Sequence, residues 1–332
     1  MKNSHALLYD MLTKFTKTMK SKQCVFPSCT NQGKIISAHS IQKNGPLAQI
    51  ANNGNIYQIQ SEITNGKDNL QVCKVGIQKA SAHYMFCEQH EQMFSVIENN
   101  KFHIIKEHVF LASLRSLMVE LYKKNFAIQF FNKNSKNITT TSFSENFLNE
   151  YISGLEFGKN DIDSLITIYL NALSKKSYDN FKYLVLEFPS PIGIVSAGAI
   201  HITSNFTNTV LLQDLADDNA KEILVFSCIS VDKKVYFIFH YPTSYKKCQK
   251  FVDSFIFLPP KERTNYLVQF FFDRCENTFF SYAFWEKLSG YQKNWLLYLA
   301  NPQTEILYAA PRTYKKDFYH FNISPKMYIN QN

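Results

Sequence analysis

Cys24-Val-Phe-Pro-Ser-Cys29 and Cys87-Glu-Gln-His90 are two short stretches that together supply four metal-binding side chains. The first has a C-x4-C spacing, and the second, more than fifty residues later, has a C-x2-H spacing. Zn²⁺ prefers four nitrogen or sulfur ligands in a tetrahedron, and folds commonly assemble them from two short-spaced pairs. The sequence therefore predicts a zinc site at Cys24, Cys29, Cys87 and His90. Four protein ligands leave no position open for water, so this site is predicted to be structural rather than reactive.

The layout of the two pairs predicts a treble-clef zinc module, in which one pair lies on a turn and a distant pair lies at the start of a helix. Between the pairs, Gly33–His39 is predicted to be a short strand that ends in a histidine. Cys73 and His83 also lie between the pairs and remain alternative ligands. Such a module can cleave nucleic acid, bind nucleic acid or only staple the fold, so the ligands alone do not decide the function.

Hydrophobic periodicity predicts an α+β protein, in which the zinc module is followed by helices and then by an antiparallel sheet flanked by helices. An amphipathic helix is expected over residues 5–19, and a long one over about residues 105–124. Residues 61–82 are polar and are expected to be mostly loop, with a short strand near Leu70–Val75. A further helical pattern covers about residues 143–175.

The second half of the chain changes to β-rich runs separated by Pro, Gly, Asn and Asp, which predict an antiparallel sheet over about residues 181–241. The runs are Tyr183–Phe188, Gly193–Ser196, Thr209–Gln213, Ile223–Ile229 and Val235–His240. Helical patterns return over residues 244–300, including Leu267–Phe284. Residues 132–142 have a linker-like composition. Two domains are therefore predicted: residues 1–130 with the zinc module and long helix, and residues 143–332 with the sheet and the C-terminal helices.

The net charge of +9 is concentrated in the first part of the chain. Residues 1–150 hold 17 Lys and Arg against 10 Asp and Glu, a net charge of +7, whereas the remaining residues hold 19 against 17, a net charge of +2. Basic surfaces bind polyanions through counterion release, so DNA or RNA is an expected partner. A genome of low G and C content, which uses Lys, Asn, Ile and Phe freely, would also explain this composition.

Cysteine use and hydropathy predict a cytoplasmic protein without a membrane segment. The seven cysteines are an odd number, and Cys228, Cys248 and Cys275 stand alone in apolar stretches, which argues against a secreted disulfide framework. The N-terminal stretch is amphipathic and lacks the continuous apolar core of a signal peptide. No run of eighteen apolar residues occurs, so no transmembrane helix is expected.

Several motifs resemble the zinc-finger segment of a widespread set of uncharacterised bacterial proteins. They are Ala38-His39-Ser-Ile41, Lys79-Ala-Ser81, Phe86-Cys-Glu-Gln-His-Glu-Gln-Met-Phe94-Ser-Val-Ile-Glu98, and Leu114-Arg115 with Glu120. The pattern of that set is a histidine after a hydrophobic strand, a Phe-Cys-x-x-His-Asp helix start, and an Arg and a Glu on the next helix. The topology is similar to that of the HNH (His-Me finger) nucleases, which recur in phage-defence and mobile-element proteins. The likeness covers about residues 20–125.

The HNH resemblance implies roles by position. His39 would be the general base that activates water against a phosphodiester, since imidazole titrates near neutrality. A divalent ion, usually Mg²⁺, would stabilise the developing charge, and Glu91 would be its ligand. Ala38 stands where HNH nucleases usually carry a metal ligand, and Glu91 stands where they often carry His or Asn. The HNH motif is therefore incomplete, and catalysis is supported by the topology and by one histidine, His39.

Simpler interpretations stay open for each of these residues. His39 can hydrogen-bond the backbone within the module or act as a fifth candidate for the zinc. Glu91 and Glu98 can belong to a solvated helix N-terminus, where exposed amides favour carboxylates. Arg115 and Glu120, which share the following helix, can pair with each other or face solvent.

The leading hypothesis is a zinc-finger protein that binds nucleic acid and acts as a metal-dependent HNH-like endonuclease in anti-phage defence, a setting that rests on resemblance alone. The alternative is a non-enzymatic, zinc-stapled adaptor or effector subunit that binds a protein partner, or a second copy of itself, through aromatic C-terminal helices. Their aromatic stripe comprises Phe270, Phe271, Phe272, Phe279, Phe280, Tyr282 and Phe284. A toxin with an unrelated active site in residues 150–300 is a third option, for which the sequence offers no residues.

Overall fold

The computed structural model describes residues 23–27, 29–31, 33–64, 67–99, 101–139, 144–217, 219–301 and 312–330, and for residues 61–64 and 67–69 it describes the backbone alone. The elements are β1 (Ile35–His39), η1 (Lys43–Leu47), α2 (Ala48–Ile50), β2 (Asn55–Thr64), β3 (Lys67–Gly76), β4 (Ala82–Cys87), α3 (Glu88–Gln92), η2 (Met93–Ile97), α4 (Lys106–Thr139), α5 (Glu145–Lys175), β5 (Phe181–Phe188), β6 (Ile194–Ser196), β7 (Gly198–His201), β8 (Ile223–Val231), β9 (Lys234–Pro242), α6 (Lys246–Ile256), α7 (Pro260–Arg274), β10 (Thr278–Phe280), α8 (Tyr282–Glu286), α9 (Gly290–Leu299) and β11 (Lys326–Ile329). The predicted mixed α+β class with antiparallel sheets is confirmed. The helix predicted over residues 5–19 lies outside the described residues.

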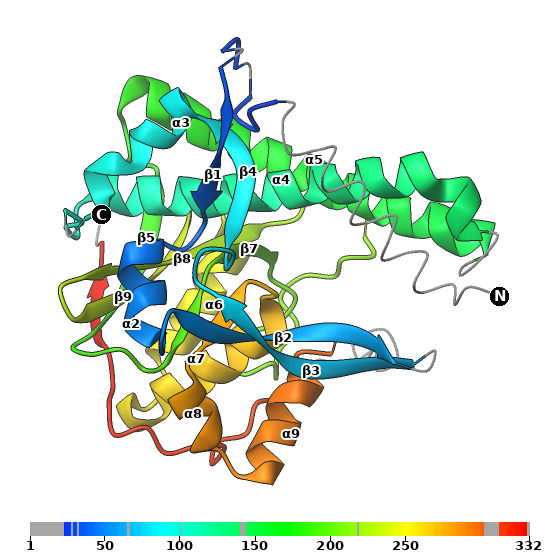
Figure 1. The fold of residues 1–332 in the computed structure, drawn as a ribbon. Coiled ribbons are helices and arrows are strands. Elements are labelled where there is room, and N and C mark those ends of the chain that lie inside the picture. The colour runs from blue at the N-terminus through cyan, green and yellow to red at the C-terminus, as the bar shows by residue number, and fades with distance from the viewer. Residues whose placement is uncertain are drawn as a thin grey trace.

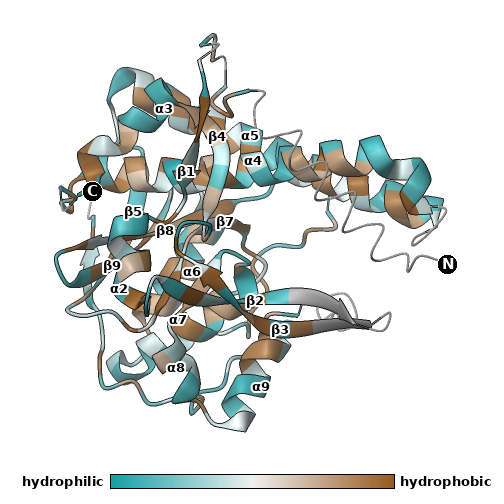
Figure 2. Cartoon of the chain, in the orientation of Figure 1, coloured by the Kyte–Doolittle hydropathy of each residue, from teal (hydrophilic) through white to brown (hydrophobic). Residues whose placement is uncertain are grey.

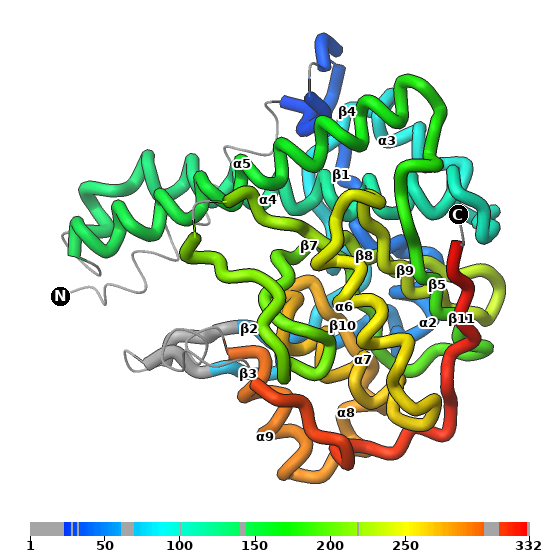
Figure 3. The backbone as a smooth tube through the Cα atoms, turned by 180° about the vertical axis from the view of Figure 1, so that it is seen from behind, coloured from blue at the N-terminus to red at the C-terminus, as the bar shows by residue number. Residues whose placement is uncertain are grey.

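The described strands form three antiparallel sheets (Figure 1). β1 pairs with β4, a second sheet has the order β3-β2-β10-β6, and the largest has the order β11-β5-β9-β8-β7. The largest sheet contains three of the predicted runs, so the antiparallel sheet predicted over about residues 181–241 is confirmed. Its edge strand β11 is not predicted. Figure 3 shows the chain from Arg312 onward running along the molecule to β11, which lies beside β5.

Helices cover both faces of the five-stranded sheet, with α4 and α5 on one face and α6 and α7 on the other (Figure 1). Alternate residues of one strand point to opposite faces. In β9, Phe237 and Phe239 therefore pack with α6 and α7, whereas Tyr236 and Ile238 pack with α4 and α5. A sheet buried on both faces needs apolar residues at consecutive positions. This explains why the sequence shows continuous apolar runs here.

Both large hydrophobic clusters draw residues from either side of the predicted division near residues 130–143. Ile41 and Ile56 share a cluster with Phe280, and β10 pairs directly with β2 through Phe280 and Tyr57. Phe94 shares the other cluster with Val225. The linker-like composition of residues 132–142 also conceals helix, because α4 continues to Thr139.

Three stretches of secondary structure differ from the prediction. Residues 61–82 are not mostly loop, since β2 and β3 form a ten-pair hairpin. Ile59, Val72 and Val75 supply its apolar face, and intervening polar residues hide the alternation. Thr209–Gln213 is not a strand and makes a single bridge, between Ser204 and Leu211. The helix expected over Leu267–Phe284 is broken by β10.

The distant ends of α4 and α5 lie side by side and extend past the sheet (Figure 1). Their residues alternate between hydrophobic and hydrophilic, as Figure 2 shows. Phe130, Ile138 and Leu148 form a small cluster between them, separate from the two large ones. Within the residues that the structure describes, none of the helices has the length and apolar content needed to cross a membrane.

Candidate metal centre and the neighbouring histidine

The four predicted zinc ligands come together in the structure. The Sγ atoms of Cys24, Cys29 and Cys87 and one ring nitrogen of His90 all lie within 4.8 Å of one another. The Nδ1 atom of His90 is 3.4 Å from Cys24 Sγ and 3.2 Å from Cys87 Sγ, and Cys29 Sγ is 3.9 Å from Cys87 Sγ. Zn–S and Zn–N bonds of about 2.0–2.3 Å at tetrahedral angles separate ligand atoms by roughly 3.3–3.8 Å. The cluster therefore has the size and the donor set that zinc requires.

Local backbone structure positions each pair of ligands. Val25 N donates to Met85 O at 2.7 Å, which ties the first pair to β4, and Cys29 N donates to Phe26 O at 3.2 Å, which closes the turn between the two cysteines. Cys87 is the last residue of β4 and the residue before α3, so His90 lies one helical turn later. Its ring stacks on Phe26 at a centroid distance of 4.1 Å. This stacking fixes the ring orientation that points Nδ1 at the thiols.

The thiols differ in how readily they ionise. Burial raises the pKa of Cys24 to about 12. Burial also acts to raise the pKa of Cys87, but hydrogen bonds from the backbone amides of His90 and Gln89 and from the two neighbouring thiols hold it below its ordinary value. Zinc binds thiolates, so metal uptake at this site must release protons.

Asn31 is a residue of this site that the sequence analysis does not predict. Its Nδ2 atom donates to Cys87 Sγ at 3.7 Å, and its Oδ1 atom accepts from Gly33 N at 2.8 Å. Groups behind the ligands orient them and tune the metal. The alternative ligands Cys73 and His83, and also His39, are not part of the cluster. His39 is therefore not a fifth ligand.

His39 ends β1 opposite Ala82 of β4 and is half-buried. Its Nε2 atom is 3.2 Å from the backbone oxygen of Ile77. A carbonyl oxygen only accepts hydrogen bonds, so Nε2 carries the hydrogen and Nδ1 keeps its lone pair. Burial lowers the pKa of His39 below 6.5, and the positive charges of Lys43 and Arg115 act in the same direction. The ring is therefore neutral at pH 7, with Nδ1 able to accept a proton.

Glu91 is held by Arg115. Arg115 Nη2 lies 2.5 Å from Glu91 Oε1, and Arg115 Nη1 lies 2.7 Å from Glu98 Oε1. The guanidinium also covers the Phe94 ring at 4.6 Å from its centroid. These contacts join α3 and η2 to α4. The predicted pairing of Arg115 with Glu120 is wrong, because Glu120 binds Lys123 on α4 instead.

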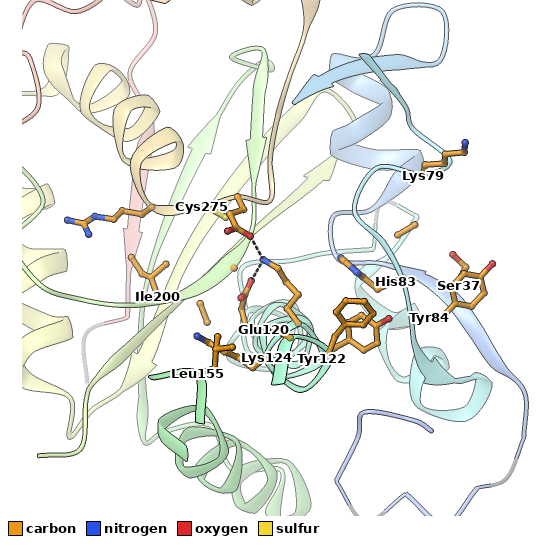
Figure 4. Close-up of a pocket in the computed structure, with 18 of the residues that line it drawn as sticks. Ser37, Lys79, His83, Tyr84, Glu120, Tyr122, Lys124, Leu155, Ile200 and Cys275 are labelled. Atoms are coloured by element: carbon orange, nitrogen blue, oxygen red, sulfur yellow. Dashed lines mark hydrogen bonds and ion pairs between the residues drawn. The ribbon is translucent and has the colours of Figure 1, made fainter. Parts of the chain in front are cut away.

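A pocket of about 880 Å³ lies beside the β1–β4 pair, and its walls come from β1, β4, α4, α5, β7 and the chain just after α7 (Figure 4). Ser37 and Ala82, which neighbour His39 along β1 and across the pair, line this pocket. Tyr122 and Lys124 of α4 line it as well. The adjacent Tyr122, Lys123 and Lys124 are the signal in the sequence that could have pointed to it.

The aromatic stripe of the C-terminal helices is almost entirely core. Six of its seven side chains are buried: Phe270, Phe271, Phe272, Phe279, Phe280 and Phe284. Tyr282 is 47% exposed. Of the aromatic stripe, only Tyr282 is therefore exposed enough to contact a protein partner, because the other rings are part of the large hydrophobic core cluster.

Comparison of the chain with protein-family models, with curated proteins and with solved structures found no match.

Proposed function

We propose that this protein binds nucleic acid through a zinc-stapled, treble-clef module and cleaves it with His39 as the general base, as an HNH-like endonuclease does. The observation that carries the proposal is the state of His39. Its Nε2 hydrogen bond to Ile77 O and its lowered pKa keep a proton-accepting Nδ1 at neutral pH. The excess of basic residues in the first 150 residues supports a polyanionic substrate.

The zinc would act as a staple in this proposal. Cys24, Cys29, Cys87 and His90 would hold it, and the closed set of four ligands would keep water from the metal. Holding the first cysteine pair against the end of β4 keeps β1 and β4 in register. That register places His39 at the end of β1 that is opposite Ala82, whereas the ligand Cys87 is opposite Ile35 at the other end of the strand pair.

In the cleavage step, Nδ1 of His39 would take a proton from water as the water oxygen attacks the phosphorus of a phosphodiester. The bond from phosphorus to the leaving sugar oxygen would break, and that oxygen would take a proton from solvent. Lys43 supplies a positive charge close enough to act on His39, and its Nζ atom donates to Gln78 Oε1 at 3.2 Å. It would bind a phosphate oxygen next to the attacking water. General bases of this kind contribute about 10²–10⁴-fold to a rate.

The residues present do not fit the Mg²⁺ that the HNH resemblance implies. Ala38 offers no ligand, and Glu91 is bound to Arg115. The proposed cleavage step therefore relies on His39 and Lys43. Phage defence remains the proposed setting, on the motif resemblance alone.

Cleavage assays test the proposal. Supercoiled plasmid, single-stranded DNA and RNA are incubated with wild-type protein, with the His39→Ala variant and with the His103→Ala variant, which changes an exposed histidine outside the site. We expect cleavage by the wild type and by His103→Ala, and a loss of at least about 100-fold in His39→Ala. The lowered pKa of His39 also predicts that the His39-dependent rate does not increase above pH 7.

Zinc content and melting temperature are measured on the same samples, so that a loss of fold is not mistaken for a loss of chemistry. If the wild-type protein leaves all three substrates intact with Mg²⁺ and with Mn²⁺, the enzymatic part of the proposal is wrong.

A specific observation favours a second candidate, a non-enzymatic adaptor in which the zinc module is a scaffold. Ala38 carries no carboxylate, and the carboxylate of Glu91 is bound to Arg115 rather than held ready for a catalytic metal. Salt-dependent binding separates the two candidates. A nucleic-acid-binding protein loses affinity steeply as salt rises, whereas a scaffold with incidental basic residues binds DNA weakly at every salt concentration.

A further inference from the structure

Two adjacent lysines of α4, Lys123 and Lys124, line the pocket. Among the described residues, Lys123 has carboxylate partners and Lys124 has none. Lys123 Nζ lies 3.4 Å from Glu120 Oε1 and 3.6 Å from Glu276 Oε2, so two carboxylates neutralise it. Lys124 makes no ion pair within 4.0 Å in the described part of the chain, although it lines the same pocket. Burial lowers its pKa. Glu120 and Glu276 act on this ammonium without a direct ion pair, and a partly buried ammonium that no described carboxylate contacts favours an anionic ligand.

Gly158 makes room for this ammonium. It lies in the middle of α5, where glycine is unfavourable relative to alanine by about 1 kcal/mol. A Cβ atom at Gly158 would lie 3.2 Å from Lys124 Nζ, which is tighter than ordinary contact. Because Gly158 has no side chain, Lys124 Nζ keeps its position on the pocket wall without this close contact.

Aromatic rings line the pocket together with the lysines. Tyr122 lies 5.6 Å from the His83 ring and 6.4 Å from the Phe126 ring, measured between centroids. Tyr84 and Tyr151 line the same pocket and are 36% and 46% exposed. Nucleobases stack on such rings irrespective of their sequence. Burial lowers the pKa of His83 to about 4, so its ring is neutral and can take part in the same surface.

The pocket has two sides, which lie on opposite sides of α4. Figure 4 shows Lys124, Leu155 and Ile200 on one side, and Tyr122, His83 and Lys79 on the other. The contacts agree, because Lys124 lies against α5 and Tyr122 lies against β4. Each side therefore combines a lysine with aromatic rings: Lys124 with Tyr151, and Lys79 with Tyr122 and Tyr84.

The charges in the pocket leave a positive surplus. Glu120, Lys123 and Glu276 together carry −1, Lys79 and Lys124 carry +2, and Arg274 is paired with Asp273. The volume of about 880 Å³ lies within the range of about 300–1,000 Å³ of pockets that hold drug-sized ligands, so the pocket can hold at least one nucleotide.

We infer that this pocket binds a single-stranded segment of nucleic acid, with phosphates on Lys124 and Lys79 and bases against Tyr122, Tyr84 and Tyr151. The inference rests on the proposed function and names its substrate as an unpaired strand. Ser37 and Ala82 line the pocket beside His39, so a strand bound here lies next to the proposed general base. A free nucleotide presents the same base and phosphate, and the test must separate the two.

Fluorescence anisotropy tests the inference in the His39→Ala background, so that cleavage does not consume the probe. The probes are a fluorescein-labelled 12-nucleotide single strand and the matching duplex, each at 50 and 200 mM salt, with AMP as competitor. We expect the single strand to bind at least tenfold more tightly than the duplex or AMP. Lys124→Met and Tyr122→Leu should each weaken strand binding about tenfold, and Lys175→Met, an exposed lysine at the end of α5, should not change it.

Gly158→Ala keeps every charge and tests the geometry. It should weaken strand binding by crowding Lys124 while leaving the melting temperature unchanged or higher, because alanine favours the helix. The inference is overturned if the pocket variants bind the strand as the His39→Ala parent does. It is also overturned if AMP binds as tightly as the strand, which would make a free nucleotide the ligand. A wild-type protein that binds the strand in the pocket without cutting it would contradict the proposed catalysis and leave the inference standing.

Discussion

Cys87 shows how much of the candidate site depends on single residues. It ends β4, precedes α3, supplies a thiol to the cluster and accepts a hydrogen bond from Asn31. The strand pairing of β4 with β1 then determines where His39 lies, since His39 is opposite Ala82. A metal at the cluster therefore stabilises the backbone that carries the proposed base.

We expect the purified protein to contain one zinc ion per chain. Cys29→Ser should abolish stoichiometric zinc and lower the free energy of unfolding by more than about 3 kcal/mol, because metal binding contributes directly to the folding of such sites. Elemental analysis and urea denaturation measure the two effects. Cys73→Ser is the matched control, because Cys73 is outside the cluster and should leave the zinc content unchanged. Full zinc occupancy in Cys29→Ser would show that this cluster is not the site.

Arg115 is a buried charge that acts on His39 and joins two carboxylates. Its side chain is 5% exposed and bridges Glu91 and Glu98. Arg115→Met removes the partner of two carboxylates, so we expect a loss of about 3–5 kcal/mol in the free energy of unfolding. Glu98→Gln, which leaves Glu91 in place, should cost about 1.5–3 kcal/mol.

Lys106→Met is the contrast in the same urea titration. The Lys106–Asp179 pair is 2.6 Å long but its side chains are 42% and 74% exposed. Its loss should cost less than about 1 kcal/mol, because water screens an exposed pair. Equal losses in Arg115→Met and Lys106→Met would mean that the Glu91–Arg115–Glu98 network contributes little to stability.

At the scale of elements, α5 and β9 meet through a buried polar pair. Tyr169 OH and His240 Nδ1 form a hydrogen bond of 2.5 Å, and the exposed fraction of the two residues is 0% and 1%. Phe110 of α4 and Phe181 of β5 pack around both rings. This apolar surrounding penalises a charged imidazole, and burial lowers the pKa of His240 to about 3.

The lowered pKa of His240 predicts acid sensitivity. The folded-state pKa lies below the unfolded value of about 6.5, so the unfolded chain binds the proton first and stability falls as the pH drops below 6.5. Between pH 7.5 and pH 5 this group alone should lower the free energy of unfolding by about 2 kcal/mol. Urea titrations at the two pH values measure it. The His240→Phe/Tyr169→Phe variant leaves neither hydrogen-bonding group unpaired, and its stability should fall about 2 kcal/mol less over that range. An identical pH dependence in both proteins would contradict the predicted protonation.

At the scale of the whole molecule, the sequence predicts features that depend on neighbouring residues better than contacts between elements that are distant in the sequence. The cysteine and histidine spacings located the cluster, because each ligand pair is local and zinc chemistry requires four partners. The sequence did not predict that Arg115 binds Glu91, since that contact depends on how α3 packs on α4. The hairpin of β2 and β3 was missed for a similar reason, because its apolar face is completed by residues of the C-terminal half.

The pairing of β2 with β10 bears on the predicted division into two domains. β10 joins residues near 280 to a strand that begins at Asn55, and the two large hydrophobic clusters contain residues from both halves. The contact of α4 with β8 likewise buries Leu117 and Val225 in one cluster. If the two halves of the chain were separated, the apolar surfaces of both clusters would be exposed to water, which soluble monomeric proteins rarely allow.

A fragment of residues 1–139 is therefore expected not to fold on its own, even with zinc. Separation would expose the face of α4 that packs on the five-stranded sheet, including Val109 and Leu114, and would leave Ile56 of β2 uncovered. Circular dichroism and limited proteolysis should show a fragment without cooperative melting that is cleaved rapidly, whereas the full chain melts cooperatively and resists the protease. Co-expression with residues 144–332 should restore protection, because the two pieces would complete both clusters. A cooperatively melting, zinc-loaded fragment would instead establish residues 1–139 as an independent domain, whose nucleic-acid binding could then be measured apart from the C-terminal sheet.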